Sequence, residues 1–298
     1  MRRVWGGRRL ESLYGKRLPS GVRIGESWEI VDREDAQSVV HNEPLRGATL
    51  HELWKARREE VFGANLPNTP RFPLLFKLLD CQDRLSVQVH PPPEVAPRFN
   101  GEPKTEMWYL MATLLDSDLY AGLKRGVTRE QFEDALHRGR VADLIHRIPT
   151  RAGEAFFIPS GRIHAIGAGN VIFEVQQNSD TTYRVFDWNR LGLDGKPRAL
   201  HLDESLASIN FDDPEPGVVE PQGEVLAECP HFRVERWEFG ENADPRSVGT
   251  ESTFAVLTVI NGRFECGGME FTDGAFFLAP AASNLTVRGQ GTLLRTTL

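Results

Sequence analysis

The stretch from Gly153 to Trp188 constrains the fold of this chain most strongly. It opens with an alternating, aromatic-rich run that is typical of a β-strand. Pro159-Ser160-Gly161 then predicts a tight turn, because proline fixes φ and glycine accepts φ > 0. His164 follows this turn at once. A histidine just past such a corner is held by rigid backbone, which is how a metal ligand needs to be held.

The spacing of these residues resembles the second sequence motif of cupins. In that motif a Gly is followed by five residues, then Pro, one residue, Gly, two residues and His. Gly153, Pro159, Gly161 and His164 fit the pattern, while Ala168 stands where the motif usually has Asn. The alternative interpretation is a solvent-exposed histidine after an ordinary hairpin turn.

Composition excludes several classes of protein. The formal net charge is −7 and the basic residues form no long run, which argues against binding to nucleic acid. No window approaches the roughly 18 apolar residues of a membrane span, and the N-terminus lacks the apolar region of a signal peptide. Three isolated cysteines suggest a reducing compartment. We therefore expect a soluble, cytoplasmic protein, with its oligomeric state left open.

Two capping-box patterns predict where helices begin. Thr49 and Glu52 form the first, and Thr128 and Gln131 form the second. The second pattern opens a helical insert near residues 127–148, which a glycine is expected to break into two short helices.

Two predicted strands carry polar side chains on one face. In the strand at residues 85–90, Gln88 and His90 point one way and the valines between them point the other. The run at residues 104–112 is another predicted strand, with Glu106 near its start. These positions, together with His164, are candidates for a common site.

An acidic, proline-rich segment at residues 212–217 is the best candidate for a linker. It divides the chain into a predicted first domain, residues 1–213, and a predicted second β domain, residues 214–298. We expect the first domain to be mainly β, with the helical insert, and the second to be smaller.

A degenerate internal repeat indicates that the two domains are related. Residues 274–280 repeat the pattern of residues 153–159, and Leu285 stands where His164 would be. The second domain is therefore expected to lack that metal ligand. Its short strands could also form an unrelated β-sandwich.

The candidate site has the composition of a metal centre. Two imidazoles and a carboxylate, from His90, His164 and Glu106, suit a divalent transition metal and leave coordination positions open for water or substrate. A structural zinc site would be closed by four ligands, and the cysteines have no such spacing. Gln88 is a candidate weak fourth ligand.

Four segments together resemble type I phosphomannose isomerase, specifically its short bacterial form. They are SVQVHP, KTEMWY, PSGRIHAIG and EVQQNSDTTYR, and they occur in the family's order. The likeness extends more weakly over roughly residues 4–212. It implies a cupin-type jelly roll with a helical insert, followed by a second β domain of degenerate cupin type.

The resemblance also implies a function and a set of ligands. The family interconverts mannose 6-phosphate and fructose 6-phosphate, so the expected partner is a hexose 6-phosphate and the expected cofactor is one zinc ion per chain. His90, Glu106 and His164 match the zinc ligands, and Gln88 matches an additional ligand of longer members.

Four further residues are candidates for catalysis. Arg184 matches the family's catalytic arginine, and because it cannot lose its charge it suits stabilisation of an enediolate or phosphate. Lys104 matches a lysine of the family, although Pro103 replaces the glycine before it. Glu174 and Asp180 are candidates for proton transfer by their place near Arg184, as is a metal-bound water. The alternatives are that Glu174 is plain solvent-facing polarity and that Asp180 caps a turn.

Two other functions compete with an isomerase. One is a non-catalytic sugar or sugar-phosphate binding cupin, and the other is an iron-dependent cupin dioxygenase. Retention of Lys104 and Arg184 beside the two histidines and Glu106 favours the isomerase, because neither alternative has an evident use for the full set.

Overall fold

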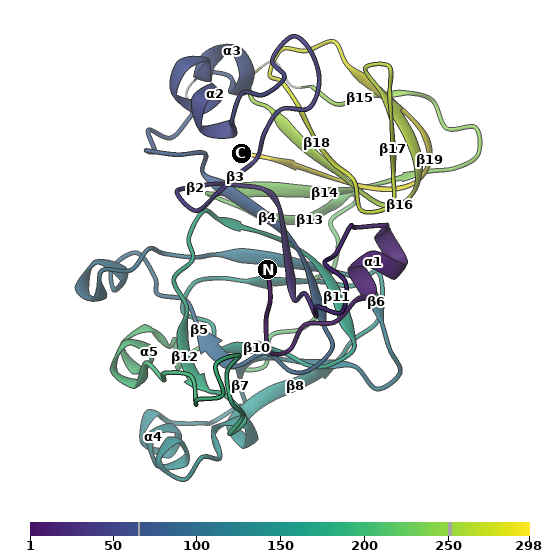
Figure 1. Ribbon diagram of the computed structural model, residues 1–298. Coiled ribbons are helices and arrows are strands. Elements are labelled where there is room, and N and C mark those ends of the chain that lie inside the picture. Colours follow the sequence, from purple (N-terminus) through teal and green to yellow (C-terminus); the bar gives the residue numbers. More distant parts are fainter. Residues whose placement is uncertain (65, 250–251) are drawn as a thin grey trace. The chain divides into compact units, whose positions relative to one another are not determined.

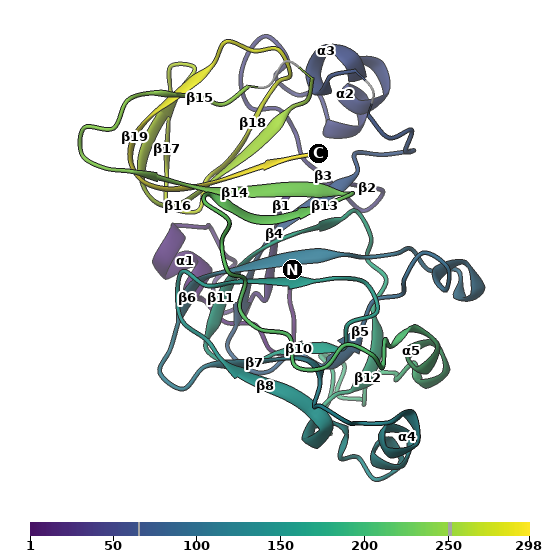
Figure 2. The same ribbon diagram turned by 180° about the vertical axis from the view of Figure 1, so that it is seen from behind.

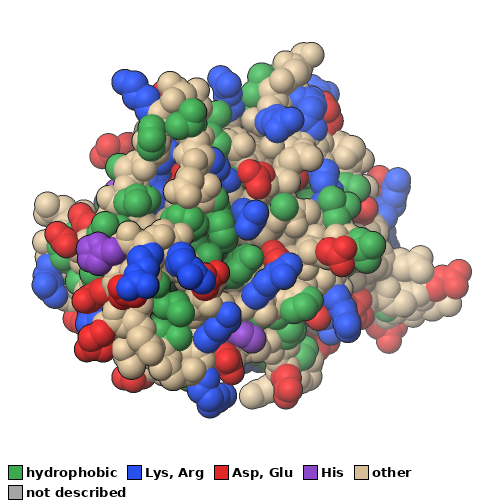
Figure 3. Space-filling model, turned by 90° about the horizontal axis from the view of Figure 1, so that it is seen from below, with side chains coloured by type: hydrophobic (Ala, Val, Ile, Leu, Met, Phe, Trp, Pro, Cys, Tyr) green, Lys and Arg blue, Asp and Glu red, His purple; other side chains and the backbone are tan. Residues whose placement is uncertain are grey.

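The computed structural model describes residues 1–64, 66–249 and 252–298. The chain is mainly β, as the sequence predicts, with short helices between the strands (Figure 1). No helix within these described ranges is long and apolar enough to cross a membrane. On the face drawn in Figure 3, acidic and basic side chains are interspersed.

The chain divides into two compact units, and it passes through the second one twice. The first unit contains Met1–Trp28 and Phe76–Val219, and the second contains Glu29–Leu75 and Glu220–Leu298. The division of the chain near residue 213 into two independently folding domains stays a prediction.

Within the residues that the structure describes, the first unit contains ten strands and several short helices. Its strands, two of which extend past the unit boundary, are β1 (Glu26–Ile30), β4 (Leu74–Cys81), β5 (Val87–Val89), β6 (Glu106–Thr113), β7 (Asp118–Leu123), β8 (Ile145–Pro149), β9 (Ala155–Ile158), β10 (His164–Ile166), β11 (Asn170–Gln177) and β12 (Tyr183–Phe186). Its helices are α1 (Arg9–Tyr14), η1 (Ala96–Phe99), α4 (Arg129–His137), η2 (Val141–Leu144) and α5 (Leu202–Ser208).

These strands form two five-stranded sheets. One has the order β1-β4-β11-β6-β9 and the other the order β12-β5-β10-β7-β8. Strands that are distant in sequence therefore lie side by side, as in a jelly roll. Apolar side chains from both sheets, including Leu79, Trp108, Leu119 and Ile166, share one buried core, so the sheets pack face to face.

Two helices cover the outer face of the second sheet. Figure 2 shows α4 and α5 beside β12, β5 and β8. A second core contains Val87, Val89 and Phe132, with Leu206 of α5 packed against it. The valines of β5 thus face this outer layer, which leaves Gln88 to face the interior between the sheets, as the alternation predicts.

Both predicted capping boxes are confirmed, at Thr49 and at Thr128. The second half of the helical insert differs from the prediction. After Gly139, which has a φ of 66°, only the short 3₁₀ helix η2 forms, and residues from Ile145 onward join the sheet as β8. Pairing with β7 satisfies the backbone of this segment and overrides its helix-like spacing of apolar residues.

The second unit has a seven-stranded sheet of its own. The main order is β13-β14-β19-β16-β17, with β15 paired to β19 and β18 paired to β16, and β2 and β3 form a separate pair. The elements are β2 (Asp32–Arg33), β3 (Ala36–Gln37), α2 (Leu50–Ala56), α3 (Arg58–Phe62), β13 (Val225–Cys229), β14 (Phe232–Phe239), β15 (Arg246–Ser247), β16 (Ala255–Cys266), β17 (Met269–Thr272), β18 (Phe276–Ala279) and β19 (Thr286–Thr297).

Aromatic rings join the two chain segments of this unit. Trp54 and Phe62 lie 5.1 Å apart between ring centroids, and Phe62 and Phe72 each contact Phe254. Such edge-to-face and tilted pairs add to the apolar burial that holds residues 29–75 against the C-terminal segment.

The internal repeat extends to the backbone conformation. The repeated runs form the strands β9 and β18, and the turn position after each has positive φ, 87° at Gly161 and 52° at Ala282. Leu285, the counterpart of His164, packs against the apolar core of the second unit. Where the first copy presents an imidazole, the second copy adds apolar volume.

Candidate active site

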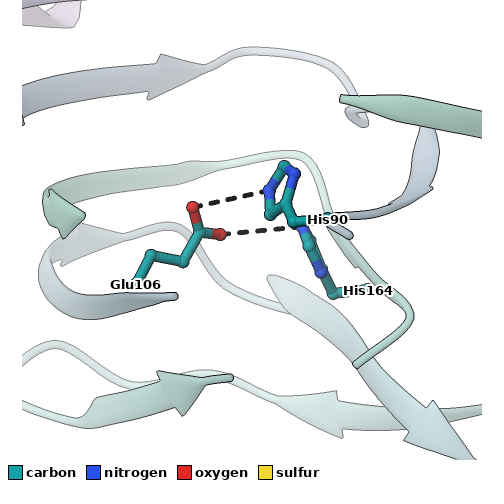
Figure 4. A group of neighbouring side chains, drawn as sticks. All are labelled: His90, Glu106 and His164. Carbon is teal, nitrogen blue, oxygen red and sulfur yellow. Dashed lines mark ion pairs between the residues drawn. The ribbon is translucent and has the colours of Figure 1, made fainter. Parts of the chain in front are cut away.

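Three predicted ligands converge inside the first unit. His90 follows β5 directly, Glu106 begins β6 and His164 begins β10, so each is held at a strand end. All three side chains are buried. His90 Nε2 lies 3.5 Å from Glu106 Oε2, and His164 Nε2 lies 3.6 Å from Glu106 Oε1 (Figure 4). The alternative of an exposed histidine after a hairpin turn is therefore wrong.

Backbone carbonyls fix the tautomer of both imidazoles. His90 Nδ1 lies 2.9 Å from the carbonyl oxygen of Thr181, and His164 Nδ1 lies 2.9 Å from that of Arg162. Since a carbonyl oxygen can only accept, each Nδ1 carries the proton and donates it. The Nε2 lone pairs are then free to face Glu106. This arrangement is the usual one for histidines that bind a metal.

Charges around the site keep the ligands in the protonation states that metal binding requires. Burial lowers the pKa of His90 to about 4, and burial also lowers the pKa of His164, so both imidazoles are neutral near pH 7. Burial alone would raise the pKa of Glu106, but the Lys104 ammonium outweighs it and holds that pKa well below its usual range. The site therefore offers two neutral nitrogens and a carboxylate.

The residues fit a zinc-type ion. Ligand atoms of His90, Glu106 and His164 all lie within 4.8 Å of one another. His90 Nε2 and Glu106 Oε1 are buried without a hydrogen-bond partner, which is costly unless something else occupies them. Gln88 lies at the same place, with its Nε2 3.1 Å from His164 Nε2.

Arg184 lies on the same sheet as Gln88 and His164. On β12 it is paired with Gln88, and Gln88 on β5 is paired with His164 on β10. Directly paired residues share a face of the sheet, so the three form one row across three strands. The Arg184 guanidinium is half-buried and donates from one Nη to the carbonyl of Ala199 at 2.9 Å, while its Nε is buried without a partner.

The two candidates for proton transfer have different environments. Glu174 is 4 % exposed, so the interpretation as a solvent-facing residue is wrong. Its Oε1 lies 3.0 Å from Lys77 Nζ, and its Oε2 accepts a hydrogen bond from Trp108 Nε1 at 3.1 Å. Asp180, in contrast, is exposed on the loop between β11 and β12.

Lys104 lies beside the ligand carboxylate. Its Nζ is 2.9 Å from Glu106 Oε2, and the side chain is buried. Burial opposes a charge on this amine, but Glu106 and Glu174 outweigh that effect and raise the pKa of Lys104. The lysine therefore stays protonated and can donate hydrogen bonds, despite the proline that precedes it.

Two residues near the site escape prediction from the sequence. Lys77, on β4, is buried next to Glu174. A lone lysine inside the apolar run FPLLFKLLD is a signal that could have found it. Asn170 is also buried, and its Nδ2 donates to the carbonyls of Asp118 and Gly167, which supports the turn between β10 and β11.

Comparison with known proteins decides the family. Residues 1–122 match the model of the phosphomannose isomerase type I catalytic domain. The chain is 39% identical over 269 residues to mannose-6-phosphate isomerase ManA of Bacillus subtilis, a match that covers 87% of this chain and 82% of that protein. The chain belongs to the type I phosphomannose isomerase family.

Solved structures of phosphomannose isomerases share the whole fold. The crystal structure of the mannose 6-phosphate isomerase from Bacillus subtilis matches with a TM-score of 0.88 at 29% identity, covering 100% of this chain and 97% of that chain. A mannose 6-phosphate isomerase solved with zinc and yttrium bound has the same fold, with a TM-score of 0.74 at 17% identity, covering 99% of this chain and 96% of that chain. The cupin-type fold predicted from the sequence is confirmed.

In the metal-free chain, the free energy of unfolding should fall as the pH is lowered from 6.5 toward 4. Folded His90 has a pKa of about 4, whereas an ordinary imidazole takes up its proton near 6.5. Between these values the unfolded chain binds more protons, so acid favours unfolding. Urea denaturation of the metal-free protein across this range measures the effect. A His90→Asn variant should show a flatter dependence, and equal slopes for both proteins would refute the assignment.

Proposed function

We propose that this protein is a zinc-dependent aldose–ketose isomerase that interconverts mannose 6-phosphate and fructose 6-phosphate. One observation carries the proposal. The Nε2 atoms of two neutral histidines converge on a buried carboxylate that also pairs with a protonated lysine. Membership of the type I phosphomannose isomerase family supports the same conclusion.

His90, Glu106 and His164 would hold the zinc ion, and Gln88 is placed to add a fourth ligand. When bound, zinc supplies Lewis-acid polarisation of a substrate oxygen. In this proposal the ligand set belongs to the first unit alone. The second unit, where Leu285 packs into the core at the position equivalent to His164, is proposed to carry no metal.

The isomerisation moves a proton between C1 and C2 of the sugar through an enediol. It needs a group that takes and returns this proton. We assign that role to Glu174, because its carboxylate is buried and is held by an ion pair with Lys77 and a hydrogen bond from Trp108. Asp180 is the weaker candidate, since an exposed carboxylate on a loop is not held in one position. A metal-bound water is not needed for this step.

Two cations would stabilise the negative charge that develops on the C1 and C2 oxygens. Lys104 is protonated and lies next to Glu106, so it serves as a donor rather than as a base. Arg184 lies in the row with Gln88 and His164, and its unpaired Nε leaves a donor for the enediolate or the phosphate.

The proposed partner is therefore a hexose 6-phosphate. All three cysteines are free thiols, in line with a reducing compartment, and we propose that the enzyme works in the cytoplasm.

The purified, zinc-loaded protein is expected to convert mannose 6-phosphate into fructose 6-phosphate, and the reverse. A coupled assay that detects fructose 6-phosphate measures the forward reaction. Mannose without its phosphate is the matched control substrate and should react far more slowly. Binding of the sugar phosphate without turnover would overturn the proposal in favour of a non-catalytic sugar-phosphate binding protein.

A further inference from the structure

Lys77 is a buried cation in the middle of a strand that is otherwise apolar around it. All eight residues of β4 are buried, and the Lys77 side chain is 4 % exposed. Its Nζ donates a hydrogen bond to Gln176 Oε1 at 2.6 Å and forms an ion pair with Glu174 Oε1 at 3.0 Å. The same ammonium lies 5.4 Å from the centre of the Trp28 ring. All these partners come from the neighbouring strands β11 and β1.

Folding stability does not explain this lysine. Removing an ammonium and a carboxylate from water costs several kcal/mol per ion, and apolar residues of similar volume are often as stable or more stable. β4 is flanked by strands rich in apolar side chains, so a leucine or methionine pair would pack there. The charge at position 77 therefore points to a role in the chemistry of the site.

The contacts of Glu174 indicate what that role is. One carboxylate oxygen faces Lys77, and the other accepts from Trp108 Nε1. An ion pair at one oxygen and a hydrogen bond at the other thus hold the carboxylate in one orientation. Trp108 is neutral, so the cation that forms an ion pair with this carboxylate is Lys77.

Glu26 balances Lys77 on its other side. Burial opposes ionisation of Glu26, but Lys77, together with hydrogen bonds from Arg3 and Trp28, lowers the pKa of Glu26 to about 2. Arg3 Nε lies 2.8 Å from Glu26 Oε1. Charges of opposite sign therefore follow one another from Arg3 through Glu26 and Lys77 to Glu174.

We propose that Lys77 is a positioning residue, which holds the Glu174 carboxylate in the orientation needed for proton transfer. The inference rests on the proposed function, in which Glu174 moves the proton between C1 and C2. Lys77 acts through Glu174 and touches no reacting atom. Its removal would leave the buried carboxylate without this ion pair, so that the hydrogen bond from Trp108 would hold its orientation less strictly.

The test compares kcat for Lys77→Met in two backgrounds, wild type and Glu174→Gln. In the wild-type background kcat should fall by about 10- to 100-fold, while KM changes little. This loss is smaller than the full contribution of a general base, because Glu174 itself remains in place. In the Glu174→Gln background the same substitution should cause little further loss, because residues that act through one another are not additive. Lys77→Arg keeps the charge and should restore part of the rate.

A second measurement does not depend on activity. The indole N–H of Trp108 donates to Glu174, so solvent exchange of its ¹⁵N-labelled signal should be faster in Lys77→Met than in wild type. Leu79→Met is the matched control, since Leu79 is buried on the same strand and packs in the interior core. It should change neither kcat nor the exchange rate. If Lys77→Met does not fold, Lys77→Arg is compared in the same two backgrounds.

The outcomes distinguish a failure of the proposed function from a failure of the role of Lys77. No turnover by the wild-type protein would remove the proposed function, and full kcat in Glu174→Gln would remove the role of Glu174. In either case the inference about Lys77 falls with it. If both roles stand, an equal loss of kcat in the two backgrounds, or no loss at all, would overturn the inference alone.

Discussion

Replacing His164 by alanine is expected to remove most of the bound zinc and nearly all isomerase activity. The imidazole is one of three ligands, and its Nε2 faces Glu106 across 3.6 Å. Alanine has no lone pair to offer, so two ligands would remain with Gln88 beside them. Wild-type protein should contain one zinc ion per chain, measured by mass spectrometry of the metal after dialysis.

The same variant should remain folded. His164 lies at a strand end, and the strand β10 keeps its backbone pairing with β5 and β7 whatever side chain stands there. Circular dichroism and thermal unfolding check this point. His137→Ala, an exposed position on α4, is the matched control and should keep its zinc. Zinc content unchanged in His164→Ala would remove His164 from the ligand set.

The ligand set could be predicted from the sequence because each ligand is fixed by local rules. Alternation along β5 places His90 and Gln88 on the face opposite to the valines. The turn that ends at Gly161, with its φ of 87°, favours a glycine and sets the start of β10. Turn chemistry and a period of two predict the places of Gln88, His90 and His164, whereas the full ligand set with Glu106 comes from the resemblance to type I phosphomannose isomerase. The structure brings the three ligands together.

The environment of Glu174 could not be predicted in the same way. Alternation shows that Glu174 faces opposite to Val175, but not whether that side is solvent or an interior. Whether Glu174 is buried depends on β4 lying beside β11 in the sheet. These two strands are far apart in the sequence, since Lys77 on β4 and its partner Gln176 on β11 are separated by 99 residues. Strand order of this kind follows from the packing of the whole sheet, and periodicity along one strand does not contain it.

The helical insert illustrates a different limit. Ile145 and Ile148 are three residues apart, which is a helical spacing, and both are buried. In the structure they belong to β8, which pairs with β7 from Asp118 to Leu123. The free strand edge of β7 provides backbone partners that a short isolated helix would lack, so the tertiary pairing outweighs the local preference.

Replacing Arg184 by alanine is expected to lower kcat by about 100- to 1000-fold, the typical effect of removing one preorganised donor. The charge of Arg184 should matter most when the C1 and C2 oxygens carry enediolate charge. An interaction made mainly in the transition state lowers kcat when it is removed, whereas uniform binding of the phosphate would appear in KM alone. The split between kcat and KM therefore distinguishes the two roles that the position of Arg184 allows.

Arg184→Lys should restore the rate only in part. Lysine keeps the charge but loses the planar fork, and the contact from the Arg184 Nη to the carbonyl of Ala199 fixes the orientation of that fork. The measurement is a coupled assay of wild type, Arg184→Ala and Arg184→Lys at saturating mannose 6-phosphate, with zinc content checked in each. Arg147→Ala is the control, because Arg147 is an exposed arginine on β8. Wild-type kcat in Arg184→Ala would exclude a catalytic role, and a rise in KM alone would assign Arg184 to the phosphate.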